Sequence, residues 1–182
     1  AAPGTIVVLH ACCHNPTGAD LSDAQWQEVV ELCRSRSLVP FLDMAYQGFA
    51  DGIDADAVAV RAFSASGLQF FVSSSFSKSF SLYGERVGAL SIVTAGKDES
   101  ARVMSQVKRV IRTNYSNPPI HGGALVAAVL STPELRQQWE SELAGMRDRI
   151  RAMRTGLVDA IKAAGVAQDF SFVVQQRGMF SY

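Results

Sequence analysis

The sequence predicts an α/β protein built on a mostly parallel β-sheet. Short apolar runs of strand length alternate with segments of helical periodicity, and polar residues follow several of these runs. One strand-like run follows the strand before it too closely for a helical crossover, which predicts one antiparallel strand. We expect helices on both faces of the sheet, and then a long helix that leads into a small α+β domain.

The first strand, helix, strand unit lies within residues 5–42. The run Thr5 to Leu9 is β-branched and aliphatic without alternation, which predicts a strand covered on both faces. The sequence Ser22 to Gln25 has the capping-box pattern that begins a helix, and this helix leads to a strand at 39–42. Since such crossovers are right-handed and join parallel strands, the two strands should be parallel neighbours.

The next segments complete the predicted sheet. A weaker helix at about 55–65 leads to a strand at 69–73. The apolar run 87–93 follows this strand after only about a dozen residues, none of them a clear helix, so we expect it to be antiparallel. A helix at 99–112 comes next, and the two prolines of segment 114–119 then force an extended link.

The second half of the chain is predicted to be helical. A short apolar helix at 122–130 precedes Pro133, which lies in the first turn of the next helix. Apolar residues at every third or fourth position extend this helix to about Ala164, roughly 48 Å at ~1.5 Å per residue. A coiled coil is the alternative, but Gly145 and Gly156 interrupt the pattern and favour a helix that links two domains.

We divide the chain into residues 1–131, part of a large domain, and residues 132–182, the linking helix and the start of a small domain. Apolar alternation from Phe170 to Val174, with Arg177-Gly178 as a turn, predicts a β-hairpin. The sequence ends inside the second strand of this hairpin. We therefore expect the chain to be the middle of a longer protein.

Composition favours small-molecule chemistry. With 48% apolar and 19% charged residues, the chain has a globular composition. Its 17 basic and 17 acidic side chains cancel, so we expect neither a nucleic-acid surface nor a polybasic membrane patch. No apolar run reaches the ~18 residues of a membrane span, and the first residues lack a signal-peptide pattern. Three cysteines, an odd number, indicate a reducing, cytoplasmic location.

One lysine is the centre of the predicted site. Lys78 follows the strand at 69–73 through a run of serines, and Arg86 lies beyond it. Ligands bind at strand ends of open α/β sheets, where desolvation lowers the pKa of a lysine and frees its amine to attack a carbonyl. Lysine, serine hydroxyls and the arginine fork together indicate a phosphorylated aldehyde. Taken alone, Lys78 would be a solvated surface residue.

Two further strand ends carry polar residues. Asp43 ends the apolar run 39–42, and the segment His14 to Gly18 follows the first strand. Asp43 alone would be a helix cap or turn residue, but three polar strand ends together predict one crevice. We expect no metal site at Cys12-Cys13-His14, because adjacent strand side chains point to opposite faces.

This ordered set resembles the aspartate and aromatic amino acid aminotransferases, class I enzymes of fold type I that use pyridoxal phosphate. The resemblance rests on His14-Asn-Pro-Thr-Gly18, Asp43-Met-Ala-Tyr46, Ser75-Phe-Ser-Lys78 with Arg86, and Asn114 to Pro119. It implies the large cofactor-binding domain of that fold and a homodimer. It also implies transamination with 2-oxoglutarate by ping-pong chemistry through pyridoxamine phosphate. The sequence is slightly closer to the aromatic branch.

The resemblance implies catalytic roles for Lys78, Asp43 and Tyr46, and a binding role for Asn15. Lys78 would bond the cofactor and then carry a proton to and from the substrate α-carbon. Asp43 would keep the pyridine nitrogen protonated. Tyr46 and Asn15 would hydrogen-bond the ring hydroxyl oxygen, and Asn15 would also lie at the substrate.

The same resemblance implies the residues that bind charged groups. Ser75, Ser77 and Arg86 would hold the cofactor phosphate. Arg112 resembles the arginine that reaches into the partner subunit's site and binds the distal carboxylate of the substrate. No metal is expected in this site.

Two other interpretations stay open. The family's residue that stacks on the cofactor ring and its arginine for the substrate α-carboxylate have no match in this chain. The chain is therefore alternatively a truncated, non-catalytic core that folds, dimerises or binds the cofactor weakly. The other alternative is a lyase or decarboxylase, against which Arg112 argues because it suits a dicarboxylate substrate.

Overall fold

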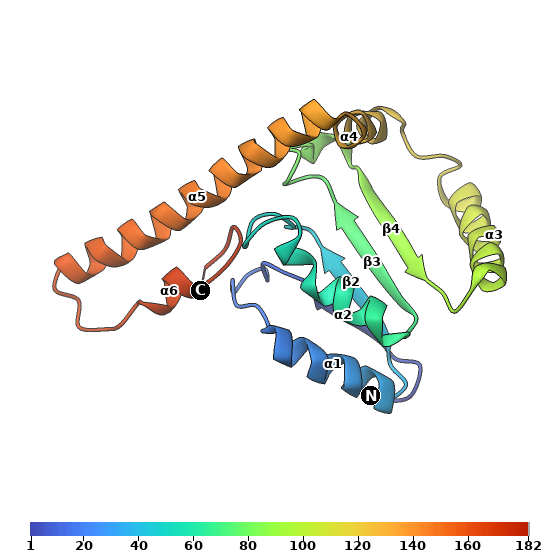
Figure 1. The fold of residues 1–182 in the computed structure, drawn as a ribbon, viewed down its shortest axis with the longest axis horizontal. Coiled ribbons are helices and arrows are strands. Elements are labelled where there is room, and N and C mark those ends of the chain that lie inside the picture. The colour runs from blue at the N-terminus through green and yellow to red at the C-terminus, as the bar shows by residue number, and fades with distance from the viewer. Residues whose placement is uncertain (182) are drawn as a thin grey trace.

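The computed structural model describes residues 1–181, which are organised around a four-stranded sheet (Figure 1). Neighbouring strands in the sheet follow one another in the chain: β1 (Ile6–His10), β2 (Val39–Met44), β3 (Phe70–Ser75) and β4 (Gly88–Val93). The first three strands are parallel, and β4 is antiparallel to β3. The predicted α/β sheet, mostly parallel with one antiparallel strand, is confirmed.

Two helices connect the parallel strands, α1 (Asp23–Ser35) and α2 (Val58–Ser66), the second preceded by the 3-10 turn η1 (Ala55–Ala57). The predicted capping box begins α1. The Gln25 amide donates to Ser22 Oγ at 3.3 Å, and the Ser22 amide donates to Gln25 Oε1 at 2.9 Å. These two bonds satisfy backbone donors that the first turn of a helix leaves unpaired.

The main hydrophobic core lies between the sheet and these two helices. Trp26 of α1 and Phe63 of α2 meet edge to face, with ring centroids 6.5 Å apart. They pack in one cluster with Leu42 of β2 and Phe70 of β3, and each of the four side chains is at most 2% exposed. Because strand side chains alternate between faces, the residues next to Leu42 and Phe70 lie on the opposite face of the sheet.

The opposite face of β1 is open in residues 1–181. Ile6 and Val8 are 58% and 64% exposed. The prediction that this strand is covered on both faces is therefore wrong for the described chain. Two successive right-handed crossovers in the same direction along a sheet place both helices on one face, and α1 and α2 do so here.

The remaining long helices are α3 (Lys97–Asn114), α4 (His121–Ser131) and α5 (Pro133–Ala163). Figure 1 shows α3 beyond β4, which is the edge strand opposite β1, and α5 running diagonally away from α4. The predicted long helix is confirmed, since α5 is continuous over 31 residues. The domain division after residue 131 stays a prediction.

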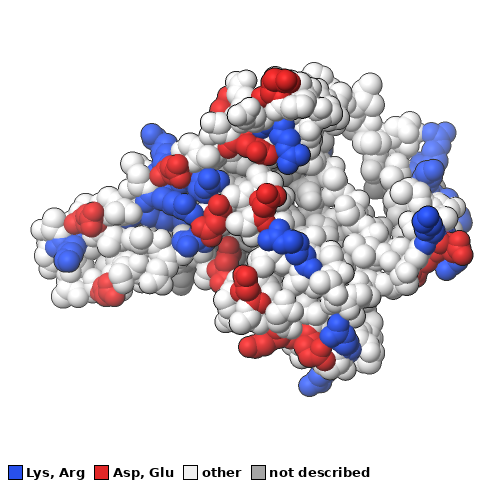
Figure 2. Space-filling model, in the orientation of Figure 1, with Lys and Arg blue, Asp and Glu red and all other residues white. Residues whose placement is uncertain are grey.

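Helix α5 is attached to the loop that follows β2. Arg147 Nη1 donates to the Gly48 carbonyl at 3.0 Å, and Arg151 Nη2 lies 2.5 Å from Asp51 Oδ1. Figure 2 shows acidic and basic side chains next to one another where α5 meets this loop. Leu143 of α5, 1% exposed, packs in a second apolar cluster between them. The loop after β2 is therefore positioned by α5 as well as by the sheet.

The predicted hairpin near the C-terminus is wrong. Residues Phe172–Gln175 form a short helix, α6, in place of a strand. The Asp169 carboxylate accepts hydrogen bonds from the Ser171 amide at 2.9 Å and the Ser171 hydroxyl at 2.8 Å, a local arrangement that begins a turn. Val173 is then buried, which shows that apolar alternation alone did not determine the structure. Tyr182, placed in the second strand, lies outside the described residues.

Candidate active site

Asp43 lies near the carboxyl end of β2, between two polar neighbours in the sheet. In the strand register it is opposite His10 of β1 and Ser73 of β3. The side chain is half-buried, and alternation with the buried Leu42 and Met44 places it on the face that α1 and α2 do not cover. Ser73 Oγ donates to Asp43 Oδ1 at 2.9 Å, which orients the carboxylate and leaves Oδ2 to accept from a ligand.

A second pair joins the loop after β1 to the loop after β2. Asn15 Nδ2 donates to the Tyr46 hydroxyl oxygen at 3.3 Å. The Asn15 amide lies 3.4 Å from His10 Nδ1, and the rings of His10 and His14 are 4.9 Å apart. Sequence reasoning missed His10, although its position at the end of the first strand was a usable signal. The pair is thus connected to the neighbour of Asp43.

The loop that carries Asn15 is fixed by a carboxylate. Asp20 accepts from the Cys13 amide at 2.7 Å and from the His14 amide at 2.9 Å. Cys13 has a φ of 54°, so the chain leaves the strand direction there. The two hydrogen bonds stabilise this left-handed residue and so determine the path of the loop toward Tyr46.

Lys78 lies against the same tyrosine. Its Nζ atom is 4.9 Å from the centroid of the Tyr46 ring. Lys78 is half-buried, whereas the chain's other lysines are exposed: Lys97, Lys108 and Lys162. The amine of Lys78 is thus in contact with an aromatic face and shielded in part from water, and its role stays a prediction.

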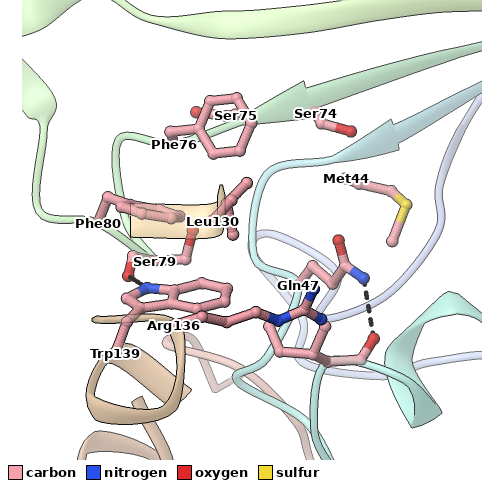
Figure 3. Close-up of a pocket in the computed structure, with 11 residues that line it drawn as sticks. Met44, Gln47, Ser74, Ser75, Phe76, Ser79, Phe80, Leu130, Arg136 and Trp139 are labelled. Atoms are coloured by element: carbon pink, nitrogen blue, oxygen red, sulfur yellow. Dashed lines mark hydrogen bonds between the residues drawn. The ribbon is translucent and has the colours of Figure 1, made fainter. Parts of the chain in front are cut away.

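A tryptophan from α5 holds the loop that carries Lys78. Trp139 Nε1 donates to the Ser79 carbonyl at 2.6 Å. Figure 3 shows the Phe80 ring lying over the Trp139 indole, and their centroids are 4.5 Å apart at 23°. The two rings line a cavity of about 220 Å³ that also reaches Ser74 and Met44. Sequence reasoning gave Trp139 no role, because nothing near it in the sequence indicates this contact.

The predicted phosphate-binding residues lie on either side of Lys78 in the chain. The Ser77 amide donates to Ser75 Oγ at 3.2 Å, and Ser77 is buried. Arg86 is exposed and has a φ of 53°, and its Nη1 donates to the Tyr83 carbonyl at 3.0 Å. The guanidinium is therefore held by its own turn, and its other N–H groups are available to an anion.

Arg112 is apart from the other predicted residues. It lies in the last turn of α3, is exposed, and its Nη1 donates to Ser116 Oγ. Figure 1 places α3 on the other side of β4 from the strand ends that carry Asp43 and Lys78. Within residues 1–181, Arg112 and the rest of the site do not come together.

We expected no metal site near the cysteines because adjacent strand side chains point to opposite faces, and this geometric reason is wrong. Ligand atoms of Cys12, Cys13 and Asp56 all lie within 4.8 Å of one another, because the left-handed Cys13 breaks the strand alternation. The pKa of the Cys13 thiol is raised, mainly by a hydrogen bond with Cys12 and secondly by burial, so the thiol stays protonated at neutral pH. The structural role expected for the cysteines stays our interpretation.

Asp56 has a structural function in the loop that follows Tyr46. Its two carboxylate oxygens accept four backbone amides at 2.7 to 3.2 Å, those of Gly48, Ala50, Asp51 and Gly52. Asp56 is 4% exposed, so these are buried, charge-assisted hydrogen bonds. The carboxylate thereby fixes the loop that connects β2 to α2.

We expect Asp56→Ala to lower the free energy of unfolding by about 3 kcal/mol or more, because each unsatisfied buried donor costs about 1–3 kcal/mol. Urea denaturation of the two proteins measures the difference. Asp54→Ala is the matched control: Asp54 is exposed, its side chain makes no capping bond, and its loss should change stability by less than about 0.5 kcal/mol. Equal effects of the two substitutions would contradict the role of Asp56.

Comparison with known proteins decides the family. The chain matches Aminotransferase class I and II over residues 1–182. It belongs to this family. The aspartate aminotransferase of Pseudomonas aeruginosa is 67% identical over 178 residues, which are 98% of this chain and 45% of that protein. The aromatic-amino-acid aminotransferase of Escherichia coli is 51% identical over 178 residues, with the same coverage of 98% and 45%.

Solved structures of this aminotransferase family have the same fold. The aromatic-amino-acid aminotransferase of Burkholderia pseudomallei, covalently bound to pyridoxal phosphate, superposes with a TM-score of 0.98 at 73% identity. The aromatic amino acid aminotransferase of Psychrobacter sp. B6, crystallised with aspartic acid, superposes with a TM-score of 0.97 at 46% identity. Each covers 100% of this chain, which in turn covers 45% and 46% of them. The chain therefore spans less than half the length of these relatives. In the described residues, no helix has the length and hydropathy needed to cross a membrane.

Proposed function

We propose that this chain is part of a pyridoxal-phosphate-dependent aminotransferase that transfers the amino group of aspartate or an aromatic amino acid to 2-oxoglutarate. The observation that carries the proposal is the position of Lys78, 4.9 Å from the ring of Tyr46, which in turn accepts a hydrogen bond from Asn15. The chain's family and the pyridoxal phosphate bound covalently to the Burkholderia relative support it.

The side chains of the site fit this cofactor. A half-buried amine can bond an aldehyde, a half-buried carboxylate can face a pyridinium nitrogen, and an asparagine–tyrosine pair can donate to a ring oxygen. The hydroxyls of Ser75 and Ser77, and the N–H groups of Arg86 that do not bond Tyr83, would supply donors for a phosphate. When bound, pyridoxal phosphate supplies an electron sink for the pair of electrons left on the substrate α-carbon as its proton departs.

The reacting proton is moved by Lys78. Once the substrate amine has displaced it from the cofactor, its amine would accept the proton from the substrate α-carbon and pass it to the cofactor, so that one residue serves as base and then as acid. Trp139 and Phe80 hold the loop of Lys78, which keeps the amine within reach of the reacting atoms.

The neighbouring residues set the charges around the cofactor ring. Asp43, oriented by Ser73, would face the ring nitrogen and keep a proton on it. Tyr46 and Asn15 donate hydrogen bonds to the ring oxygen and thereby stabilise its negative charge. Asn15 is exposed, so it is also accessible to a substrate carboxylate.

The distance of Arg112 from these residues supports a two-subunit site. We propose a homodimer in which Arg112 binds the distal carboxylate of a substrate held in the partner subunit, as the family resemblance implies. We propose in addition that the enzyme is cytoplasmic, and that residues 1–131 and 132–182 belong to its large and small domains. The relatives have both aspartate and aromatic names, so an assay with both amino acids decides the preference.

A second candidate function is a non-catalytic core. It is favoured by the 45% coverage of the Pseudomonas relative, and because the family's ring-stacking residue and its arginine for the α-carboxylate have no match in this chain. In this case the chain would fold and bind pyridoxal phosphate weakly, but it would not transaminate.

A chimera tests both candidates. This chain replaces the matching segment of the Pseudomonas protein, and the chimera and the isolated chain are assayed with 2-oxoglutarate and either aspartate or phenylalanine. We expect the chimera to be active and the isolated chain to be slower by about 100-fold or more, because positioning of the substrate is incomplete.

The controls separate the outcomes of this assay. The unmodified Pseudomonas protein gives the reference rate, and circular dichroism shows whether the chimera is folded. A folded chimera that binds pyridoxal phosphate but transfers no amino group from either amino acid would overturn the proposed function. Equal rates for the isolated chain and the chimera would show that the segment needs no further residues.

A further inference from the structure

Arg154 is a buried cation in the C-terminal half of α5, and the proposed function gives it no catalytic role. Its side chain is 7% exposed in total. All three guanidinium nitrogens donate hydrogen bonds, and every acceptor lies in residues 176–181. The bonds are Nε to Ser181 Oγ at 2.9 Å, Nη1 to the Gln176 carbonyl at 2.5 Å, and Nη2 to the carbonyls of Gly178 at 2.8 Å and Phe180 at 2.5 Å.

The charge of Arg154 is balanced by dipoles and not by an acid. No carboxylate lies within salt-bridge distance of it in residues 1–181. Burial lowers its pKa from the ordinary value, but an arginine stays charged at neutral pH. A buried charge without a counter-ion is costly and needs a full set of hydrogen bonds. The turn at 176–181 wraps around the guanidinium and supplies them.

The turn that Arg154 holds is pressed against the loop of Asn15. The Arg177 amide donates to the Gly18 carbonyl at 2.7 Å. A Cβ atom at Gly18 would be 2.5 Å from the Phe180 carbonyl oxygen, and one at Gly178 would be 2.4 Å from Cys13 Cβ. The two backbones therefore approach as closely as glycine permits, and small movements of the turn are transmitted to the loop.

The same turn places an aromatic ring on the candidate site. Phe180 meets the Tyr46 ring edge to face, with centroids 5.8 Å apart at 86°. Tyr46 is the residue that contacts both Lys78 and Asn15. A chain of direct contacts thus leads from Arg154 through Phe180 to Tyr46.

We propose that Arg154 is a positioning residue of this site. By holding residues 176–181 it keeps Phe180 against Tyr46, and it thereby sets the direction of the phenol hydroxyl and the position of the Asn15 loop. For its effect on the cofactor this inference rests on the proposed function. Its effect on the turn does not.

The first test needs no cofactor. In a Cys12→Ser, Cys33→Ser background Cys13 is the single thiol, and it is fully buried under Gly178. Arg154→Met should raise its rate of reaction with Ellman's reagent by about tenfold or more, because the charged hydrogen bonds that close the turn are lost. Arg149→Met is the matched control, since it removes an exposed arginine from the same helix. Equal thiol rates in the two variants, with both proteins folded, would overturn the proposal.

The second test distinguishes positioning from general stability. With pyridoxal phosphate bound to Lys78, the absorbance is titrated with pH for four proteins: unmodified, Arg154→Met, Phe180→Leu and the double variant. The midpoint of this absorbance change is the pH at which half of the bound cofactor has lost its proton. Weaker donation from Tyr46 to the ring oxygen stabilises the deprotonated form less, so the midpoint should move to higher pH in each single variant. If Arg154 acts through Phe180, the double variant should shift no further than the larger single shift.

Further variants keep the outcome decisive. Additive shifts in the double variant, or an unchanged midpoint in Phe180→Leu, would contradict action through Phe180. Arg154→Lys keeps the charge but cannot reach all the carbonyls, and it replaces the methionine variant if that protein does not fold. These titrations use the chimera. If the folded chimera without these substitutions does not bind pyridoxal phosphate, the proposed function fails, and the thiol rates still decide the role of Arg154.

Discussion

Replacing Lys78 with alanine is expected to abolish transamination by the chimera, with a loss of about 10⁴-fold or more. In the proposed role, this one side chain would supply both the covalent bond to the aldehyde and the transfer of the α-carbon proton, and general acid–base catalysis alone contributes about 10²–10⁴-fold. The amine lies 4.9 Å from the Tyr46 ring, so its loss removes the reactive group without disturbing a core contact. Lys97→Ala, at an exposed site on α3, should leave the rate unchanged.

Chemical labelling identifies the lysine independently of the rate. The isolated chain is mixed with pyridoxal phosphate, reduced with borohydride and mapped by peptide analysis. We expect the label on Lys78, because it is half-buried beside the other candidate site residues, whereas the other lysines are exposed. Label distributed over Lys97, Lys108 or Lys162 at equal or greater yield would remove the assignment.

The strands and the long helix could be predicted from sequence because their signals are local. The short connection between β3 and β4 was enough to predict the antiparallel pair, and regular apolar spacing was enough to predict α5. The site residues follow strand ends, so their approach to one another is a consequence of sheet topology. This explains why Asp43 and Lys78 could be selected before any contact was known, whereas Tyr46 was selected from the family resemblance.

The contacts that hold the site together could not be predicted in this way. Trp139 and Ser79 are separated by 60 residues, and Arg154 meets Phe180 across 26 residues. Neither pair has a sequence pattern that marks it, since each depends on where α5 passes the sheet. The short helix α6 is a case in which a local pattern misled the prediction. Apolar alternation predicted a strand, but packing against α5 and the local turn at Asp169 determined a helix.

Asp43→Ala in the chimera is expected to lower transamination by about 100-fold or more while the fold persists. Electrostatic groups aimed at a developing charge typically contribute about 10²–10³-fold. Asp43→Asn should lose nearly as much, because it keeps the shape and the contact with Ser73 but not the negative charge. Ser73→Ala removes only the hydrogen bond that orients the carboxylate, and it should cost about tenfold or less.

The distinction between charge and structure decides whether Asp43 has the proposed role. Asp43 is half-buried and, in residues 1–181, the one hydrogen bond of its side chain is to a neighbouring strand, so urea denaturation should show a stability change within about 1 kcal/mol.

A cofactor analogue methylated at the ring nitrogen carries a permanent positive charge and needs no carboxylate to keep it. It should therefore restore much of the rate to Asp43→Ala but add nothing to the unmodified protein. Near-normal turnover of Asp43→Ala with ordinary pyridoxal phosphate would show that the electron sink is maintained by another group, and His10, in register with Asp43 on the adjacent strand, would then be the next residue to replace.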